Sequence, residues 1–270
     1  MKRVALVSLL VAGLASSAMA GPIGDTGAFE LKRVYGYYYN NGGEFTVFGY
    51  GTSLTNESYS SAPGAQTRDI TGATAPSLPS FQTFCLELTE QARTPDYFVV
   101  GSSAVKGGTS DPSHLYDQIS YGTAWLYSQF ARGVLSVPLV GGAGNYFAPG
   151  GPSRSTEAGL LQNALWMLEQ ELLTTDSRYN LSNPYYAAAV SMFGAEAAGD
   201  APVGYLDVYV LNNFATAAQR DAFVKDGSIS GVMQDFLYLR TTAVPDGGTT
   251  MMLLGGALLG LGALRRRFGR

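Results

Sequence analysis

The order of apolar and polar positions predicts strands near both ends of the chain and helices between them. Residues 29–55 alternate and are rich in Tyr, Phe and Val, and the Asn-Asn-Gly-Gly sequence at 40–43 divides them, which is typical of a β-hairpin. Further short apolar runs predict strands at 81–88, 97–100, 205–212 and 236–239.

In the middle of the chain, apolar residues recur every three or four positions, which predicts helices. The clearest is 156–173, where Leu161, Leu165, Leu168 and Leu172 form one stripe. The other predicted helices are 113–131, 184–193 and a short one at 215–224. Two stretches rich in small residues, Gly and Pro predict loops at 56–80 and 133–153. The fold class is therefore α+β, as a single domain.

The N-terminus has the three parts of a secretory signal peptide. Two basic residues precede an apolar run from Val4 to Ala15, and Ala18 and Ala20 form an A-x-A cleavage site. We therefore assign residues 1–20 to a signal peptide that the Sec export machinery reads, in preference to an N-terminal anchor helix. The exported domain then covers residues 21–243.

The C-terminus, residues 244–270, combines a short motif, an apolar segment and a basic end. The segment 249–264 is uncharged, and with its flanking glycines it is long enough for a transmembrane helix. The arginines after it predict a cytoplasmic end, which leaves the preceding domain outside. The motif is Val244, Pro245, Asp246, Gly247 and Gly248, and the stop-transfer residues are Arg265, Arg266 and Arg267.

These three parts in this order resemble the PEP-CTERM sorting signals of Gram-negative bacteria, with Val-Pro-Asp-Gly-Gly in place of Pro-Glu-Pro. The resemblance covers residues 244–268. It implies that an exosortase, a membrane transpeptidase-like enzyme, cuts near the motif and releases or attaches the protein at the cell surface or in the extracellular matrix. A plain tail anchor is the alternative.

Charge and composition exclude several classes of function. Without its two terminal segments the chain keeps eleven basic and twenty acidic residues, a net charge of −9, so we expect no nucleic-acid partner. One Cys and one His exclude a Cys-based zinc site and most multi-His metal sites, and we expect neither a metal nor a cofactor.

The lone cysteine is the most informative residue of the exported domain. A free thiol is a liability in an oxidising environment, and Cys85 lies in an apolar run that predicts the middle of a strand. On the predicted helix 156–173, Gln162 lies about 60° from Leu165, at the edge of the apolar stripe. A polar amide at that position needs a hydrogen-bond partner.

Phe84-Cys85-Leu86-Glu87 and Gln162-Asn163-Ala164-Leu165-Trp166 resemble the two motifs of internal-thioester domains in bacterial surface adhesins. The resemblance covers about residues 81–172, and Leu161 stands where that family has Thr. It implies a Cys85–Gln162 thioester that fixes the protein covalently to a surface or polysaccharide target, shielded from water by Phe84 and Trp166. This would not be an enzyme, because such a bond reacts once.

Other interpretations stay open at this point. Cys85 is also consistent with an inert buried thiol or an intermolecular disulfide. A second function is a carbohydrate-binding matrix protein that uses the tyrosines at 35–39 and 185–186, although such clusters also pack β-faces. A secreted hydrolase is a third, but the chain lacks a Gly-x-Ser-x-Gly motif.

Overall fold

The computed structural model describes residues 24–39, 42–49, 80–105, 116–139, 142–146 and 154–240. The predicted signal peptide with Ala18 and Ala20 lies outside this range. So do the motif Val244–Gly248, the predicted span 249–264 and Arg265–Arg267. Among the helices that are described, none has both the length and the apolar character needed to cross a bilayer.

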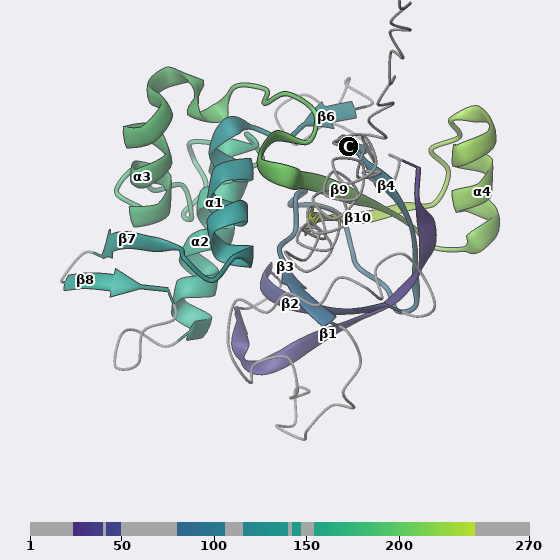
Figure 1. Ribbon diagram of the computed structural model, residues 1–270, viewed down its shortest axis with the longest axis horizontal. Coiled ribbons are helices and arrows are strands. Elements are labelled where there is room, and N and C mark those ends of the chain that lie inside the picture. The colour runs from purple at the N-terminus through teal and green to yellow at the C-terminus, as the bar shows by residue number, and fades with distance from the viewer. Residues whose placement is uncertain are drawn as a thin grey trace, which may run out of the picture.

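The fold is α+β, with antiparallel strands at both ends of the chain and helices in the centre, as the hydrophobic pattern predicts (Figure 1). Six strands form the main sheet in the order β10-β9-β4-β1-β2-β3, and all neighbours are antiparallel. Their bounds are β1 Thr26–Tyr39, β2 Gly42–Gly49, β3 Ser80–Thr83, β4 Asp96–Gly101, β9 Val208–Phe214 and β10 Val232–Leu239.

The sheet curls until its two edge strands, β3 and β10, meet (Figure 1). The Leu237 N–H donates to the Phe84 carbonyl at 3.2 Å, and the Leu86 N–H donates to the Asp235 carbonyl at 3.0 Å. Phenylalanines fill part of the core that this curvature creates, with Phe236 packed edge-on against Phe29 and Phe45. Aromatic contacts of this kind add to the hydrophobic gain from burial.

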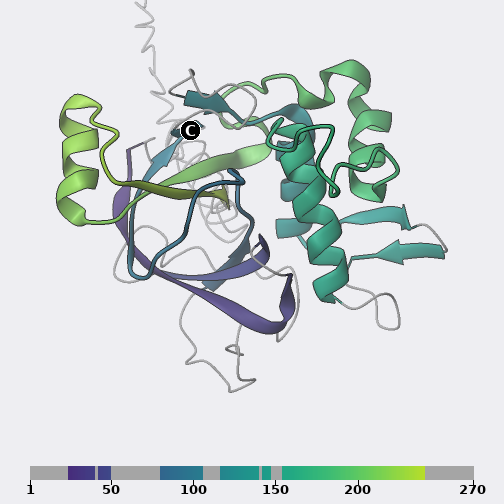
Figure 2. The same ribbon diagram turned by 180° about the vertical axis from the view of Figure 1, so that it is seen from behind.

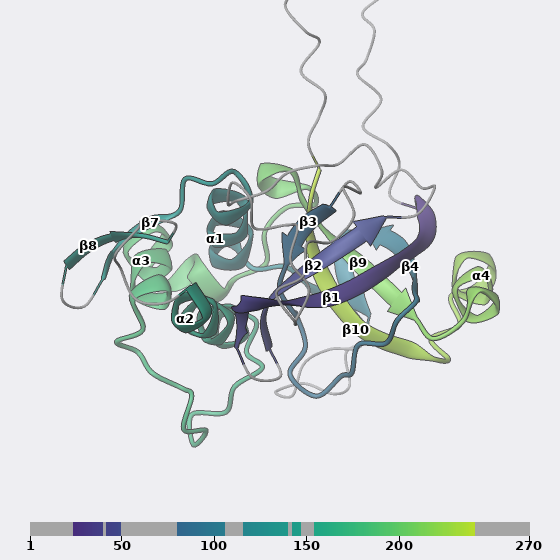
Figure 3. The same cartoon turned by 90° about the horizontal axis from the view of Figure 1, so that it is seen from below.

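Three helices lie on one side of the curved sheet and the fourth lies at its opposite end (Figures 2 and 3). Polar caps fix several of their starts: the Ser120 side chain accepts from Thr123 N–H, and the Asn183 side chain accepts from two N–H groups of the next helix. The apolar faces of the first two helices join the main core. Their bounds are α1 Tyr121–Ala131, α2 Arg154–Leu168, α3 Pro184–Phe193 and α4 Ala217–Asp226.

The structure corrects several predicted elements. The helix predicted over 113–131 begins only at Tyr121, because Tyr116–Gln118 pair as strand β6 with β5, Ser103–Val105. The stretch predicted as a loop at 133–153 contains a second hairpin, β7 Ser136–Leu139 and β8 Gly142–Asn145. The strand predicted over 81–88 ends at Thr83, so Cys85 lies beyond β3 and not in the middle of a strand.

Candidate functional site

The segment 84–87 is held from one side by β10. Phe84 and Leu86 pair with β10 through the backbone bonds described above, and Cys85 lies opposite Phe236. One Glu87 carboxylate oxygen accepts from the Asp235 N–H at 3.0 Å and from the Gln234 side chain at 2.8 Å. Because residues of an extended segment alternate, the N–H and C=O of Cys85 point away from β10.

The Gln162 side chain of α2 takes the place of a neighbouring strand for Cys85. Its Oε1 accepts from the Cys85 N–H at 3.0 Å, and its Nε2 donates to the Cys85 carbonyl at 2.8 Å. The same Oε1 accepts from the Gly43 N–H at 3.1 Å. Gln162 is only 1% exposed, and these three bonds satisfy a buried amide that would otherwise be costly.

This arrangement places the amide carbon of Gln162 near the backbone nitrogen of Cys85. A carbonyl bond is about 1.2 Å long, so that carbon lies within about 4.2 Å of the Cys85 nitrogen. The sulfur is three bonds from the same nitrogen. The structure therefore brings together the two residues that the sequence singles out, although 77 positions separate them.

Two glycines at the start of β2 allow α2 to approach this closely. A Cβ on Gly42 would lie 2.6 Å from Cη2 of Trp166 and 3.0 Å from Cγ of Gln162. Gly43 has a φ of +94°, in the range that favours glycine. The predicted Asn-Gly turn therefore also serves the site, because it supplies the Gly43 N–H.

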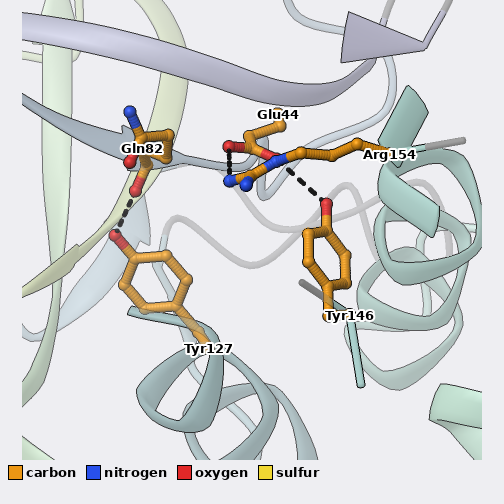
Figure 4. A network of polar contacts seen from close by, with 5 residues as sticks. All are labelled: Glu44, Gln82, Tyr127, Tyr146 and Arg154. Atoms are coloured by element: carbon orange, nitrogen blue, oxygen red, sulfur yellow. Dashed lines mark hydrogen bonds and ion pairs between the residues drawn. The ribbon is translucent and has the colours of Figure 1, made fainter. Parts of the chain in front are cut away.

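A buried ion pair ties the start of α2 to the same strand (Figure 4). Arg154 contacts both carboxylate oxygens of Glu44, at 2.5 and 2.8 Å, and the Tyr146 hydroxyl donates to one of them at 3.1 Å. Burial raises the pKa of Glu44, while the charge of Arg154 acts in the opposite direction. Glu44 follows Gly43 directly, so this pair fixes β2 and α2 relative to one another at the site.

Electrostatics around Cys85 favour the neutral thiol. Burial raises the pKa of Cys85 well above its usual range, the nearby Glu87 adds to this effect, and Arg33 opposes it. Burial also raises the pKa of Glu87, and the neighbouring Asp235 and Glu90 raise it further. Both groups therefore favour their uncharged forms, and the sulfur is not a thiolate open to attack by oxidants.

Cys85 borders a cleft of about 790 Å³. Trp166 and Phe45 border it too, and the guanidinium of Arg178 lies 5.5 Å from the centre of the Trp166 ring. The cleft's other lining residues come from β1, from the segment 88–94 and from β10: Leu31, Lys32, Arg33, Leu88, Thr89, Glu90, Gln91, Ala92, Arg93, Thr94 and Gln234.

The two residues predicted to shield the site lie in different places. Trp166 borders the cleft beside Cys85, whereas Phe84 packs edge-on against Phe130 of α1 in the core, 4.9 Å between ring centres. Sequence reasoning missed Gly43 and Phe45. Gly43 contributes a backbone N–H, which no side-chain pattern reveals, and Phe45 was assigned only to the hairpin.

Chemically, the site polarises one amide carbonyl. Two N–H donors lie 3.0 and 3.1 Å from Oε1 of the intact amide and polarise its carbonyl group. Among the described residues, no group of three or more His, Cys, Asp or Glu could hold a metal ion. Tyr185 is fully buried and donates to Glu157, so it offers no face for stacking a sugar.

Comparison with known proteins identifies the C-terminal segment alone. Residues 243–268 match the model of the VPDSG-CTERM motif, a PEP-CTERM-like sorting signal. This motif implies an exported, sorted protein that an exosortase-like enzyme processes, with C-terminal membrane anchoring or processing. Neither the curated proteins nor the solved structures gave a match to the chain.

Proposed function

We propose that this exported protein carries an internal thioester between Cys85 and Gln162 and uses it once to attach itself covalently to a target. The Cys85 sulfur bonds to the Gln162 side-chain carbon and the carbon–nitrogen bond breaks. The thiol proton leaves with the amide nitrogen as ammonia. A target amine or hydroxyl later attacks the same carbon, which forms an amide or ester and returns the thiol.

The observation that carries this proposal is the three-bond contact of the Gln162 amide with Cys85 and Gly43. Here the amide lies against the chain's single cysteine, with its oxygen between two N–H donors. Holding the two groups together replaces a bimolecular encounter with an intramolecular step.

The surroundings supply the remaining needs of the reaction. The Gly43 and Cys85 N–H groups stabilise the negative charge that develops on Oε1 in both steps. Because burial keeps the thiol neutral, its proton has to pass to the amide nitrogen as the sulfur attacks, and it leaves with that nitrogen. Cys85 is only 3% exposed, and this burial limits hydrolysis of the stored bond.

The sorting signal indicates where in or outside the cell this reaction takes place. A protein that is exported and then processed near its C-terminus is delivered to the cell surface or the extracellular matrix, where amines and hydroxyls of other molecules are accessible. The protein acts as a single-use cross-linker and not as an enzyme, because capture consumes the thioester.

The test is the intact mass of the full chain, exported, purified in mild detergent and kept near neutral pH. A thioester lowers the mass by about 17 Da relative to the processed sequence, through the loss of ammonia. Treatment with methylamine should then raise the mass to about 14 Da above the sequence value and free one thiol.

Cys85→Ala is the control, because it removes the nucleophile and leaves the amide. It should show the sequence mass before and after methylamine. If the wild-type protein also has its full sequence mass, a titratable thiol and no methylamine adduct, the proposal is wrong and Cys85 is an inert core residue.

A further inference from the structure

The charged residues of the cleft differ from those of the domain as a whole. Residues 21–243 contain nearly twice as many acidic as basic residues. Yet four of the eleven basic residues line this cleft, whereas only one acidic residue lines it. These five are Lys32, Arg33, Arg93, Arg178 and Glu90.

Part of this positive charge is neutralised by ion pairs. Lys32 pairs with Glu30 at 3.0 Å, and Arg178 pairs with Asp176 at 2.6 Å. Arg33 and Arg93 form no ion pair with any residue in the described ranges. Both are exposed, so their charges are available to a ligand.

Arg33 is held where its charge acts on the reacting sulfur. Its guanidinium carbon lies 5.7 Å from the ring centre of Phe45, which borders the cleft together with Cys85. The positive charge of Arg33 lowers the pKa of Cys85, against the stronger effects of burial and of the nearby Glu87. A charged group on a ligand that approaches Cys85 therefore meets the same field.

Two carboxylic acids lie near the thiol, and the charge of Glu87 affects the pKa of Cys85 more strongly than the charge of Arg33 does. Glu87 is buried, and burial together with its acidic neighbours raises its pKa. Asp235 accepts from the Val105 and Asn213 N–H groups, each at 2.8 Å, and such donors favour the negatively charged form of a carboxyl group.

We infer that the cleft selects a ligand in which an anionic group lies close to the attacking amine or hydroxyl. This inference rests on the proposed thioester and adds the chemical class of its target. Arg33 and Arg93 attract the carboxylate, sulfate or phosphate of the ligand and hold its nucleophile over the Gln162 carbon. A ligand with a second positive charge is repelled.

Three small primary amines of equal length test this inference on the full chain. Taurine carries a negative sulfonate, ethanolamine carries no further charge, and (2-aminoethyl)trimethylammonium carries a positive one. Adduct formation is followed by intact mass at low ionic strength, at equal concentrations of the unprotonated amine. We expect taurine to react about tenfold faster than the trimethylammonium compound, with ethanolamine between them.

Two further measurements identify the source of the preference. The double variant Arg33→Gln, Arg93→Gln should lower the ratio of the taurine rate to the trimethylammonium rate to a value between about 1 and about 3. The control double variant Arg132→Gln, Lys225→Gln removes the same charge elsewhere and should leave this ratio unchanged. Added salt should also reduce the ratio, because it screens exposed charges.

The outcomes separate this inference from the function on which it rests. Equal rates for the three amines, or faster reaction of the cationic one, would overturn the inference while the thioester stands. Failure of every amine to give an adduct, with the full sequence mass retained, would overturn both.

Discussion

The floor and the rim of the cleft are built in opposite ways. We call Cys85, Gln162 and Gly43 the floor. All three are buried, only Cys85 borders the cleft, and their polar groups are paired with one another at 2.8 to 3.1 Å. The rim, Arg33 and Arg93, is exposed and carries charges without ion pairs in the described part of the chain. Under the proposed function, the floor provides the geometry for bond formation and the rim selects the target, so each can be changed alone.

The largest expected effect concerns Asp96, which joins the rim to the buried interior. It accepts from the Arg93 N–H at 3.3 Å, and burial raises its pKa from 3.8 to about 7. Between these values the folded protein holds a proton that the unfolded chain has lost, so stability falls as pH rises. Urea unfolding at pH 4 and pH 8 should show a loss of about 4 kcal/mol from this group.

Asp96→Asn should remove that part of the pH dependence, because the amide is neutral throughout. Asp176→Asn is the matched control, since Arg178 lowers the pKa of Asp176 to about 2 and its contribution is lost only as pH falls below about 4. An unchanged slope in Asp96→Asn would show that the carboxyl is ionised in the folded state.

Breaking the Glu44–Arg154 ion pair should lower the free energy of unfolding by slightly less than the ionisation of Asp96 does. Arg154→Met leaves Glu44 buried without its cation, and we expect the free energy of unfolding to fall by about 3 kcal/mol, measured by urea unfolding. Arg132→Met removes an exposed pair with Asp207 and should cost less than about 1 kcal/mol. Equal costs for the two changes would mean that the buried pair does not anchor α2.

Removing the Gln162 amide should lower the free energy of unfolding by less than breaking the Glu44–Arg154 pair does, but by more than changing the rim does. In a Cys85→Ala background, where no thioester forms, Gln162→Ala leaves two N–H groups and one carbonyl without partners. We expect a loss of about 2 kcal/mol by urea unfolding. Asn163→Ala changes the neighbouring, less buried amide on the same helix and should stay within about 0.5 kcal/mol. A loss no larger than that of Asn163→Ala would contradict the assigned hydrogen bonds.

The rim should contribute least to stability. Arg33→Gln with Arg93→Gln should shift the free energy of unfolding by less than about 0.5 kcal/mol, because both side chains are exposed. A large loss would mean that the rim is part of the structural framework, and the distinction between floor and rim would fail. Thermal unfolding followed by circular dichroism is sufficient for this comparison.

Local patterns predicted much of this fold. The hairpin about the Asn-Gly turn, helix α3 after Asn183 and the leucine stripe of α2 as far as Leu168 follow from turn chemistry, capping and period, and the structure confirms them. The predicted helix continued to residue 173, whereas α2 ends at Leu168, so Leu172 lies beyond it. The strands β7 and β8 were missed because Gly142, Gly144 and Pro138 give no strand signal. Their pairing depends on neighbours rather than on intrinsic preference.

The site was predicted in part for a related reason. Cys85 and Gln162 stand out because each residue type is unusual at its position, and the structure brings them into contact. The Gly43 N–H and the Glu44–Arg154 pair have no such signal, because a backbone donor has no side chain and the pair joins residues 110 positions apart. Such contacts exist only once the sheet and α2 have packed.

The most direct test of the thioester is a crystal structure of the exported protein, prepared near neutral pH without amine buffers. We predict continuous electron density between the Cys85 sulfur and the Gln162 side-chain carbon, with no density for the amide nitrogen. Separate side chains at non-bonded distance, with the Gln162 amide intact and still bound to the Cys85 backbone, would contradict the account.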